Sequence, residues 1–271
     1  MPELPEVETT RRGLAPHIIG QRIEDVVVRD RRLRWPVASS IEKQLIGHII
    51  RATARRGKYL LLDCEVGWLL LHLGMSGSLR LVTQGVLAEK HDHVDILLSN
   101  GVAIRFTDPR RFGAMIWAGP TPEMHPLLAG LGLEPLGDDL SGQWLYEATR
   151  GAKVAIKLWL MDAKRITGIG NIYANEALFR AGIRPTSPAG GISLKRFERL
   201  AVAIQETLLR AIEAGGSTLR DFVGASGNPG YFQQEYFVYG RAGENCHVCH
   251  HNIKLIRQSG RATFYCSNCQ R

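Results

Sequence analysis

Four of the five cysteines form two Cys-x-x-Cys pairs near the end of the chain, and their spacing constrains the fold of that region more than any other sequence feature. Cys246 and Cys249 make the first pair and Cys266 and Cys269 the second, with sixteen residues between the pairs. This is the spacing of a four-cysteine zinc ribbon. Four thiolates complete a tetrahedron without the three neighbouring histidines, so the pattern predicts structural zinc with no open position for catalysis.

The residues between the cysteine pairs predict a basic β-hairpin. Residues 253–257 and 261–265 have strand character and are joined by Gln258-Ser259-Gly260. Arg261 then projects from the tip, with Lys254 and Arg257 nearby. Such a hairpin either docks on a phosphate backbone or enters a groove, or it is simply solvated.

Composition favours a polyanionic partner. The 271 residues carry a net charge of +8, and 45% of them are hydrophobic, enough for two domains with real cores. Nucleic acid is therefore the leading partner. No secretory signal is evident, and the longest apolar run is far shorter than the roughly 20 residues of a membrane span. We expect a soluble, intracellular protein, in which paired cysteines bind metal instead of forming disulfides.

The N-terminal half is predicted to be mostly β. After a first helix over about residues 5–18, short β-type runs suggest a sandwich or a barrel. Asn100-Gly101 supplies the positive φ values of a tight hairpin turn. The predicted strands cover residues 22–28, 49–54, 59–64, 68–73, 78–82, 93–98, 103–107 and 114–117.

The opening residues could carry chemistry. Methionine removal is expected before a small residue such as Pro2, and it leaves a secondary amine one residue from the Glu3 carboxylate. A free α-amine has a pKa of about 7.7–8.0, so part of it is a neutral nucleophile near pH 7. A helix beginning near Pro5 lowers that pKa, whereas Glu3 and Glu6 raise it. The alternative is a capped helix start on a solvated terminus.

Three charged stretches interrupt the predicted strands. Lys58 could point into a cleft as a general acid or a phosphate ligand, or lie at a solvated strand entry. The stretch 90–93, Lys-His-Asp-His, is a weak metal site, and a phosphate contact by His91 or a polar turn is favoured. Arg110 and Phe112 lie on a Pro- and Gly-containing loop, where they could enter a base stack or form an ordinary turn with a buried ring.

From about residue 122 the pattern becomes helical. Helices are predicted over residues 153–162 and 171–180, and a longer helix opens at Ser193 and stops at Gly215-Gly216. Gly168, Gly170 and an N-capping Asn171 form either a phosphate seat or an ordinary interhelical turn. The glycine-rich segment 217–232 is predicted to be a mobile linker or flap.

Taken in this order, these segments resemble the bacterial formamidopyrimidine-DNA glycosylase family of 8-oxoguanine glycosylase/lyases. The resemblance covers essentially the whole chain and is carried by residues 1–9, 57–60, 73–77, 90–93, 108–113, 170–173 and 261–266. It implies a two-lobed α+β protein. The implied parts are a catalytic β-sandwich (2–118), a helix-two-turn-helix region (119–225), a linker (226–236) and a zinc finger (237–271).

The resemblance also implies the chemistry. Pro2 would attack C1′ of a damaged nucleotide and form a Schiff base, with Glu3 as acid/base. Lys58 would donate a proton in β-elimination and Arg261 in δ-elimination. The partner would be double-stranded DNA carrying oxidised purines or abasic sites, bound by a monomer in the cytoplasm at the nucleoid.

DNA contacts follow from the same resemblance. Met75, Arg110 and Phe112 would fill the void left by the extruded base, and residues 217–231 would cover the lesion. His91, Arg110, Lys153 and Asn171 would contact the DNA backbone or the orphaned base. The run around Lys153 is less basic than the family pattern, and His250 stands where glycine is usual. Histidine tolerates positive φ, so local strain is expected at His250 without loss of metal.

Two alternatives remain open from the sequence. One is an endonuclease VIII-type glycosylase for oxidised pyrimidines with the same Pro2 chemistry. The other is a non-enzymatic zinc-ribbon DNA-binding protein whose N-terminus is inert.

Overall fold

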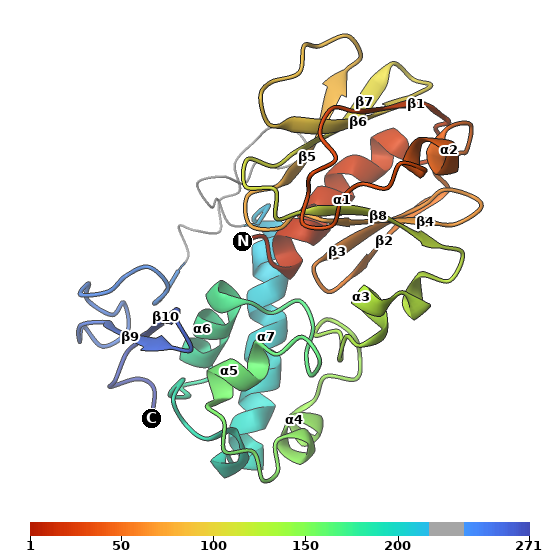
Figure 1. The fold of residues 1–271 in the computed structure, drawn as a ribbon. Coiled ribbons are helices and arrows are strands. Elements are labelled where there is room, and N and C mark those ends of the chain that lie inside the picture. Colours follow the sequence, from red (N-terminus) through yellow and green to blue (C-terminus); the bar gives the residue numbers. More distant parts are fainter. Residues whose placement is uncertain (217–235) are drawn as a thin grey trace. The chain divides into compact units, whose positions relative to one another are not determined.

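The computed structural model describes residues 1–216 and 236–271, and these divide into two compact units (Figure 1). The first unit contains residues 1–129 with 214–216, and the second contains residues 130–213 with 236–271. The predicted flap over residues 217–231 lies outside the described residues. The boundaries inferred from the sequence at residues 118, 225 and 236 stay predictions.

The N-terminal unit is a sandwich of two four-stranded antiparallel sheets, and all eight predicted strands are confirmed. The sheet orders are β1-β6-β7-β5 and β2-β3-β4-β8. The first sheet contains β1 (Ile23–Val28), β5 (Ser78–Thr83), β6 (Asp92–Leu98) and β7 (Val102–Thr107). The second contains β2 (Ala52–Arg56), β3 (Tyr59–Asp63), β4 (Trp68–His72) and β8 (Ala114–Gly119).

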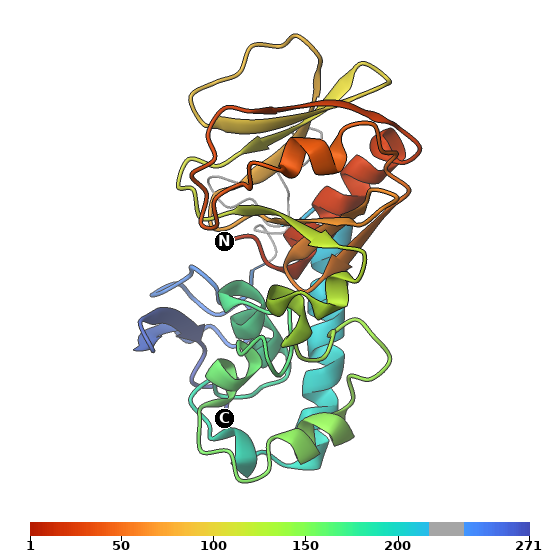
Figure 2. The same cartoon turned by 45° about the vertical axis from the view of Figure 1, so that its right-hand side comes forward.

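Helix α1 (Leu4–Ile18) is part of this core, and it confirms the predicted first helix. It contacts β2 and β3 of one sheet and β5 of the other, and Figure 2 shows it running alongside the sheets. Val7, Leu14 and Ile18 are buried in one apolar cluster with residues from both sheets. The short helices α2 (Ile41–Leu45) and α3 (Pro126–Ala129) and the 3₁₀ turn Pro122–Met124 complete the unit.

The hairpin turn between β6 and β7 differs from the prediction. Only Gly101 has positive φ (80°), whereas Asn100 does not. Three residues, Ser99 to Gly101, join the strands, and the Gly101 N–H donates to Leu98 O (3.1 Å). A three-residue loop needs a single left-handed position, whereas the expected two-residue turn needs two.

The second unit consists of short helices around one long helix and carries the cysteine hairpin. Its helices are α4 (Gly142–Ala148), α5 (Ile156–Leu160), α6 (Asn171–Arg180) and α7 (Leu194–Glu213), with a 3₁₀ turn at Ala189–Gly191. Both α4 and α6 pack on α7, whose buried face includes Phe197, Leu200 and Ile204. The hairpin consists of β9 (Lys254–Gln258) and β10 (Arg261–Tyr265), and β10 packs against α6.

Two helix predictions in this unit are corrected. The helix expected over residues 153–162 is shorter, because Ala155 bridges Pro188 and the Ile156 N–H donates to Ser187 O (2.8 Å), which holds the approach to α5 extended. The N-cap of α6 is the extended Gly170, so Asn171 is the first helical residue and not the cap. No helix in the described ranges combines the length and apolar character of a membrane span.

Candidate functional site

The N-terminus is held at the start of α1. Glu3 is the N-cap, and its backbone N–H donates to Glu6 Oε2 (2.8 Å) in a capping box. Pro2, Glu3 and Glu6 are buried, whereas Met1 is 43% exposed. The nitrogen of Pro2 is therefore fixed relative to the sandwich, and Met1, the residue that blocks it, is partly exposed.

A pocket of about 520 Å³ opens beside this terminus. Sequence reasoning identified Met75 and Phe112 but missed Arg34 and His72, although His72 immediately precedes the predicted Leu73-to-Gly77 stretch. The terminus, a strand end and three loops thus meet at one cavity of the N-terminal unit. The described residues that line the pocket are Met1, Arg34, His72, Gly74, Met75, Arg111 and Phe112.

Lys58 reaches this region through the β2–β3 hairpin. Gly57 has positive φ (56°), which lets the chain turn before Lys58. Burial lowers the pKa of His72 to about 4, and the charges of Lys58 and then Arg34 add to that effect. His72 Nδ1 accepts a hydrogen bond from the Gly74 N–H (3.1 Å), so the neutral ring carries its proton on Nε2. The neutral imidazole of His72 therefore lies near Lys58 and also lines the pocket at the N-terminus.

Helix α1 and the Lys58 hairpin are joined by Arg55. Its Nε lies 3.4 Å from Glu8 Oε2, and its NH1 donates to Gly57 O (3.0 Å). Burial would raise the pKa of Glu8, but hydrogen bonds from Arg11 and Arg12, with the nearby charges, lower it to about 2. The ionised Glu8 thus anchors the hairpin that carries Lys58 to the helix that carries Pro2.

Two loops present exposed apolar side chains side by side. Met75 is 40% and Phe112 43% exposed, so the alternative of a buried ring is wrong. A Cβ on Gly74 would lie 2.4 Å from the carbonyl carbon of Phe112, and Gly74 has φ of 60°, so only glycine allows this approach. We call Met75 and Phe112 with their two loops the wedge.

Buried Asp108 joins the two loops of the wedge. Its Oδ1 accepts from Ser76 Oγ (2.9 Å), and its Oδ2 accepts from the Gly113 N–H (2.7 Å). Its backbone carbonyl accepts from His93 Nε2 (2.7 Å). One fully buried carboxylate therefore makes a rigid unit of two loops that are far apart in sequence.

Arg110 and Arg111, on the loop that carries Phe112, differ in role. The Arg110 guanidinium lies 4.9 Å from the centre of the Phe112 ring and has no carboxylate partner among residues 1–216 and 236–271. Arg111 has positive φ (58°) and pairs with Asp30 at 2.6 Å. Arg110 is thus the arginine available to a ligand.

The stretch from Lys90 to His93 is not a metal site in the structure. Asp92 is buried and paired with Arg80 and Arg105 (both 3.3 Å), and His93 is occupied by Asp108. The His91 carbonyl accepts from the Asp108 N–H (3.0 Å), so His91 lies next to the wedge. Within the described ranges, only the four C-terminal cysteines are grouped to hold a metal ion.

In the second unit, the start of α6 and the exposed Lys153 are the places where backbone contacts were predicted. Gly168 has positive φ (84°), and Gly170 is extended before the helix. Asn171 Oδ1 is buried without a hydrogen-bond partner in the described structure. The N–H groups at a helix start attract anions. The glycines therefore still precede a helix start, as the predicted phosphate seat requires, although the cap residue is Gly170.

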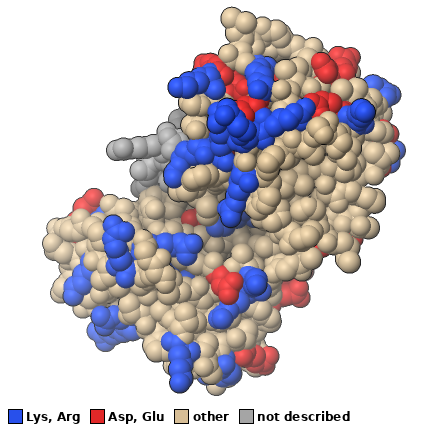
Figure 3. All heavy atoms as spheres, viewed as in Figure 1, with Lys and Arg blue, Asp and Glu red and all other residues tan. Residues whose placement is uncertain are grey.

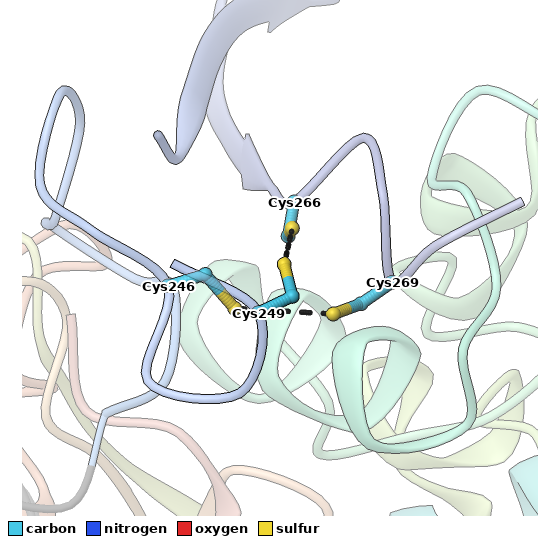
Figure 4. Close-up of side chains that lie close together, drawn as sticks. All are labelled: Cys246, Cys249, Cys266 and Cys269. Atoms are coloured by element: carbon cyan, nitrogen blue, oxygen red, sulfur yellow. Dashed lines mark hydrogen bonds between the residues drawn. The ribbon is translucent and has the colours of Figure 1, made fainter. Parts of the chain in front are cut away.

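The four cysteines converge as the spacing predicted. Their ligand atoms all lie within 4.8 Å of one another (Figure 4). His250 has φ of 63°, which confirms the expected left-handed position. The His251 N–H lowers the pKa of Cys249 to about 5, whereas burial raises those of Cys266 and Cys269. A divalent cation would displace the remaining thiol protons, so the residues present fit a metal ion.

The hairpin that carries Arg261 is fixed by buried polar groups that sequence reasoning missed. Lys157 Nζ donates to Ala262 O (2.9 Å) and Thr263 Oγ1 (2.7 Å), and Asn175 Oδ1 accepts from the Phe264 N–H (2.9 Å). Arg261 itself is exposed at the tip, as predicted. A lysine inside an apolar helical stretch gives no sequence sign of a partner about a hundred residues away.

Comparison with known proteins identifies the same architecture. Residues 1–115 match the formamidopyrimidine-DNA glycosylase N-terminal domain, and residues 131–223 match the H2TH domain of formamidopyrimidine-DNA glycosylase. The formamidopyrimidine-DNA glycosylase of Stutzerimonas stutzeri (strain A1501) is 58% identical over 100% of both chains. That of Cupriavidus pinatubonensis (strain JMP 134 / LMG 1197) is 55% identical, again over 100% of both.

Solved structures agree. The MutM (Fpg) protein of Thermus thermophilus has a TM-score of 0.88 and 38% identity, covering 99% of this chain and 98% of that one. The Lactococcus lactis Fpg in complex with abasic-site DNA has a TM-score of 0.90 and 34% identity, covering 99% of both.

Fold and site together define a DNA glycosylase of base excision repair. With relatives of this identity along its whole length, the chain belongs to the formamidopyrimidine-DNA glycosylase family, whose members are also AP lyases. The predicted family and two-part α+β fold are confirmed.

The pKa of His72 generates a pH prediction. The folded chain keeps His72 neutral down to pH about 4, whereas the unfolded chain takes up a proton below about 6.5. The unfolded state binds more protons in that window, so the free energy of unfolding should fall by about 3 kcal/mol as the pH drops through it. Urea unfolding at pH 7 and pH 4 should show that His72→Gln loses this part of the pH dependence. The exposed control His17→Gln should behave like the parent; equal behaviour of both variants would contradict the assignment.

Proposed function

We propose that this chain excises oxidised purines, 8-oxoguanine and formamidopyrimidines, from double-stranded DNA with Pro2 as the nucleophile, and then cleaves the strand. The observation that carries the proposal is the pocket at the N-terminus, whose wall includes both side chains of the wedge. Solved Lactococcus lactis relatives are complexes with Fapy-dG DNA and with abasic-site DNA.

The chemistry follows from a secondary amine. Once Met1 is removed, the Pro2 nitrogen attacks C1′, the glycosidic bond breaks, and the base leaves with a proton. Opening of the sugar ring then gives an iminium ion, which is cationic without further protonation and makes the C2′ proton acidic. Loss of that proton expels the 3′ phosphate, and a second elimination expels the 5′ phosphate. Glu3 is assigned as acid/base, Lys58 as proton donor in the first elimination, and Arg261 in the second.

The wedge supports extrusion of the damaged nucleotide. Flipping a base costs a few kcal/mol, and apolar side chains that enter the stack offset part of this cost. We assign Met75 and Phe112 to this role, with Arg110 placed over the Phe112 ring to reach the orphaned base. His91, Lys153 and Asn171 are assigned to the backbone or the orphaned base, as the chain's charge of +8 favours.

We further assign one structural zinc ion to Cys246, Cys249, Cys266 and Cys269. Bound there, zinc would hold the base of the hairpin that carries Arg261, and four thiolates leave it no open position. The flap over residues 217–231, action as a monomer, work at the nucleoid in the cytoplasm, and domain boundaries at 118, 225 and 236 belong to the same proposal.

Borohydride trapping tests the proposed function. Borohydride reduces a Schiff base at Pro2 to a stable amine. Duplex DNA with 8-oxoguanine should therefore yield a covalent adduct, and peptide mapping should locate the attached DNA on residue 2. Duplex with an oxidised pyrimidine should trap much less. Preference for the pyrimidine would favour the endonuclease VIII-type alternative, and absence of any adduct would leave only a DNA-binding module.

Arg261→Ala should separate the two eliminations. General acid catalysis is worth on the order of a hundredfold, so the δ-elimination product should fall by about that factor while base release and the β-elimination product persist. Gel analysis of the cleaved strand ends measures this ratio. Lys254→Ala, an exposed cation on the neighbouring strand, is the matched control and should keep the parent product ratio. Unchanged δ-elimination in Arg261→Ala would refute the assigned role.

A further inference from the structure

Four arginines lie on the segment that connects β1 to α2, and one of them differs from the rest. Figure 3 shows Lys and Arg side chains gathered on one face of the N-terminal unit, with carboxylates among them. Arg34 has no carboxylate partner within residues 1–216 and 236–271, whereas each of the other three forms an ion pair. Their ion pairs are Arg29–Asp95, Arg31–Glu42 and Arg32–Asp30.

Arg34 is held at the pocket beside the N-terminus. Its backbone N–H donates to Gly113 O (3.2 Å), at the base of the wedge. Its guanidinium lies 4.8 Å from the centre of the Trp35 ring, which supports the side chain without neutralising it. The residue is exposed and lines the same pocket as Met1, Met75 and Phe112.

The charged side chains that line this pocket are both arginines. No Asp or Glu is among its described lining residues, and the second lining cation, Arg111, is committed to Asp30 at 2.6 Å. Lys58 and Arg34 both act electrostatically on His72. Two cations around a neutral ring, with no acid on the pocket wall, are arranged to receive an anion.

We propose that Arg34 binds a backbone phosphate of the damaged strand beside the extruded nucleotide. The proposal rests on the proposed function, because it takes the pocket at Pro2 as the place where the damaged strand enters. A guanidinium presents a planar fork that matches a phosphate bidentately. Among the pocket's described lining residues, Arg34 is the cation whose guanidinium forms no ion pair with a carboxylate.

The test measures affinity for a duplex with a tetrahydrofuran abasic-site analogue over a range of salt concentrations. Arg34→Ala should bind about tenfold more weakly, as expected for loss of a charge-assisted contact. Its plot of log K against log salt should be shallower by about 0.9, the value for one phosphate. Arg34→Lys should have the salt slope of the parent but only part of the parent's affinity, because lysine keeps the charge without the bidentate geometry. Arg32→Ala is the matched control, since Arg32 is exposed and paired with Asp30, and should keep the parent slope.

A methylphosphonate scan locates the contact. Neutralising one phosphate near the lesion should weaken binding by the parent but not binding by Arg34→Ala. At every other phosphate, the effect of the methylphosphonate and the effect of Arg34→Ala should add. Additivity at every phosphate, or an unchanged salt slope in Arg34→Ala, would overturn the proposal. Borohydride trapping of the parent with a matched duplex that carries 8-oxoguanine keeps the two proposals apart, because the tetrahydrofuran analogue has no leaving group at C1′ and forms no Schiff base. Failure of the proposed function would appear as a missing parent adduct with the 8-oxoguanine duplex, whatever the salt slope.

Discussion

Burial of α1 against both sheets is the constraint on which the rest of the site depends. Because Val7, Leu14 and Ile18 are locked into the sandwich core, the first turn of the helix cannot move without disturbing that core. The capping box between Glu3 and Glu6 carries this rigidity to the residue that follows Pro2. A nucleophile at a chain end would ordinarily be the most mobile atom of a protein. Here the nitrogen of Pro2, the nucleophile that we propose, is placed with the precision of a core residue, which is what an attack on a single sugar carbon requires.

Within each unit, buried polar contacts position the candidate functional groups. Asp108 makes one body of the two wedge loops, Glu8 and Arg55 join the Lys58 hairpin to α1, and Lys157 and Asn175 fix the hairpin of Arg261. In each case a buried group anchors a partly or fully exposed one. The exposed side chains are therefore preorganised for DNA, and their geometry does not have to be assembled when DNA binds.

The sequence predicted elements better than it predicted contacts. Short β-type runs identified all eight strands, and the cysteine spacing predicted the grouping of the four thiols, because both patterns are local. Arg34 and His72 were missed because they become neighbours only when segments about forty residues apart fold together. The capping role given to Asn171 was wrong because Gly170 already takes the extended conformation that the cap needs. Likewise, α5 is shorter than the helical spacing of its apolar residues predicted. The residues before α5 pair with residues 187–189, a contact that no local pattern reveals.

The central claim is that the processed imino terminus at Pro2 forms the bond to DNA. The most direct measurement compares two fractions in one preparation that contains both forms of the chain. Intact mass gives the fraction that lacks Met1, and the amplitude of a single-turnover reaction with excess 8-oxoguanine duplex gives the active fraction. We predict that the two fractions are equal. Chains that retain Met1 and yet release the base and cleave the strand would contradict the account.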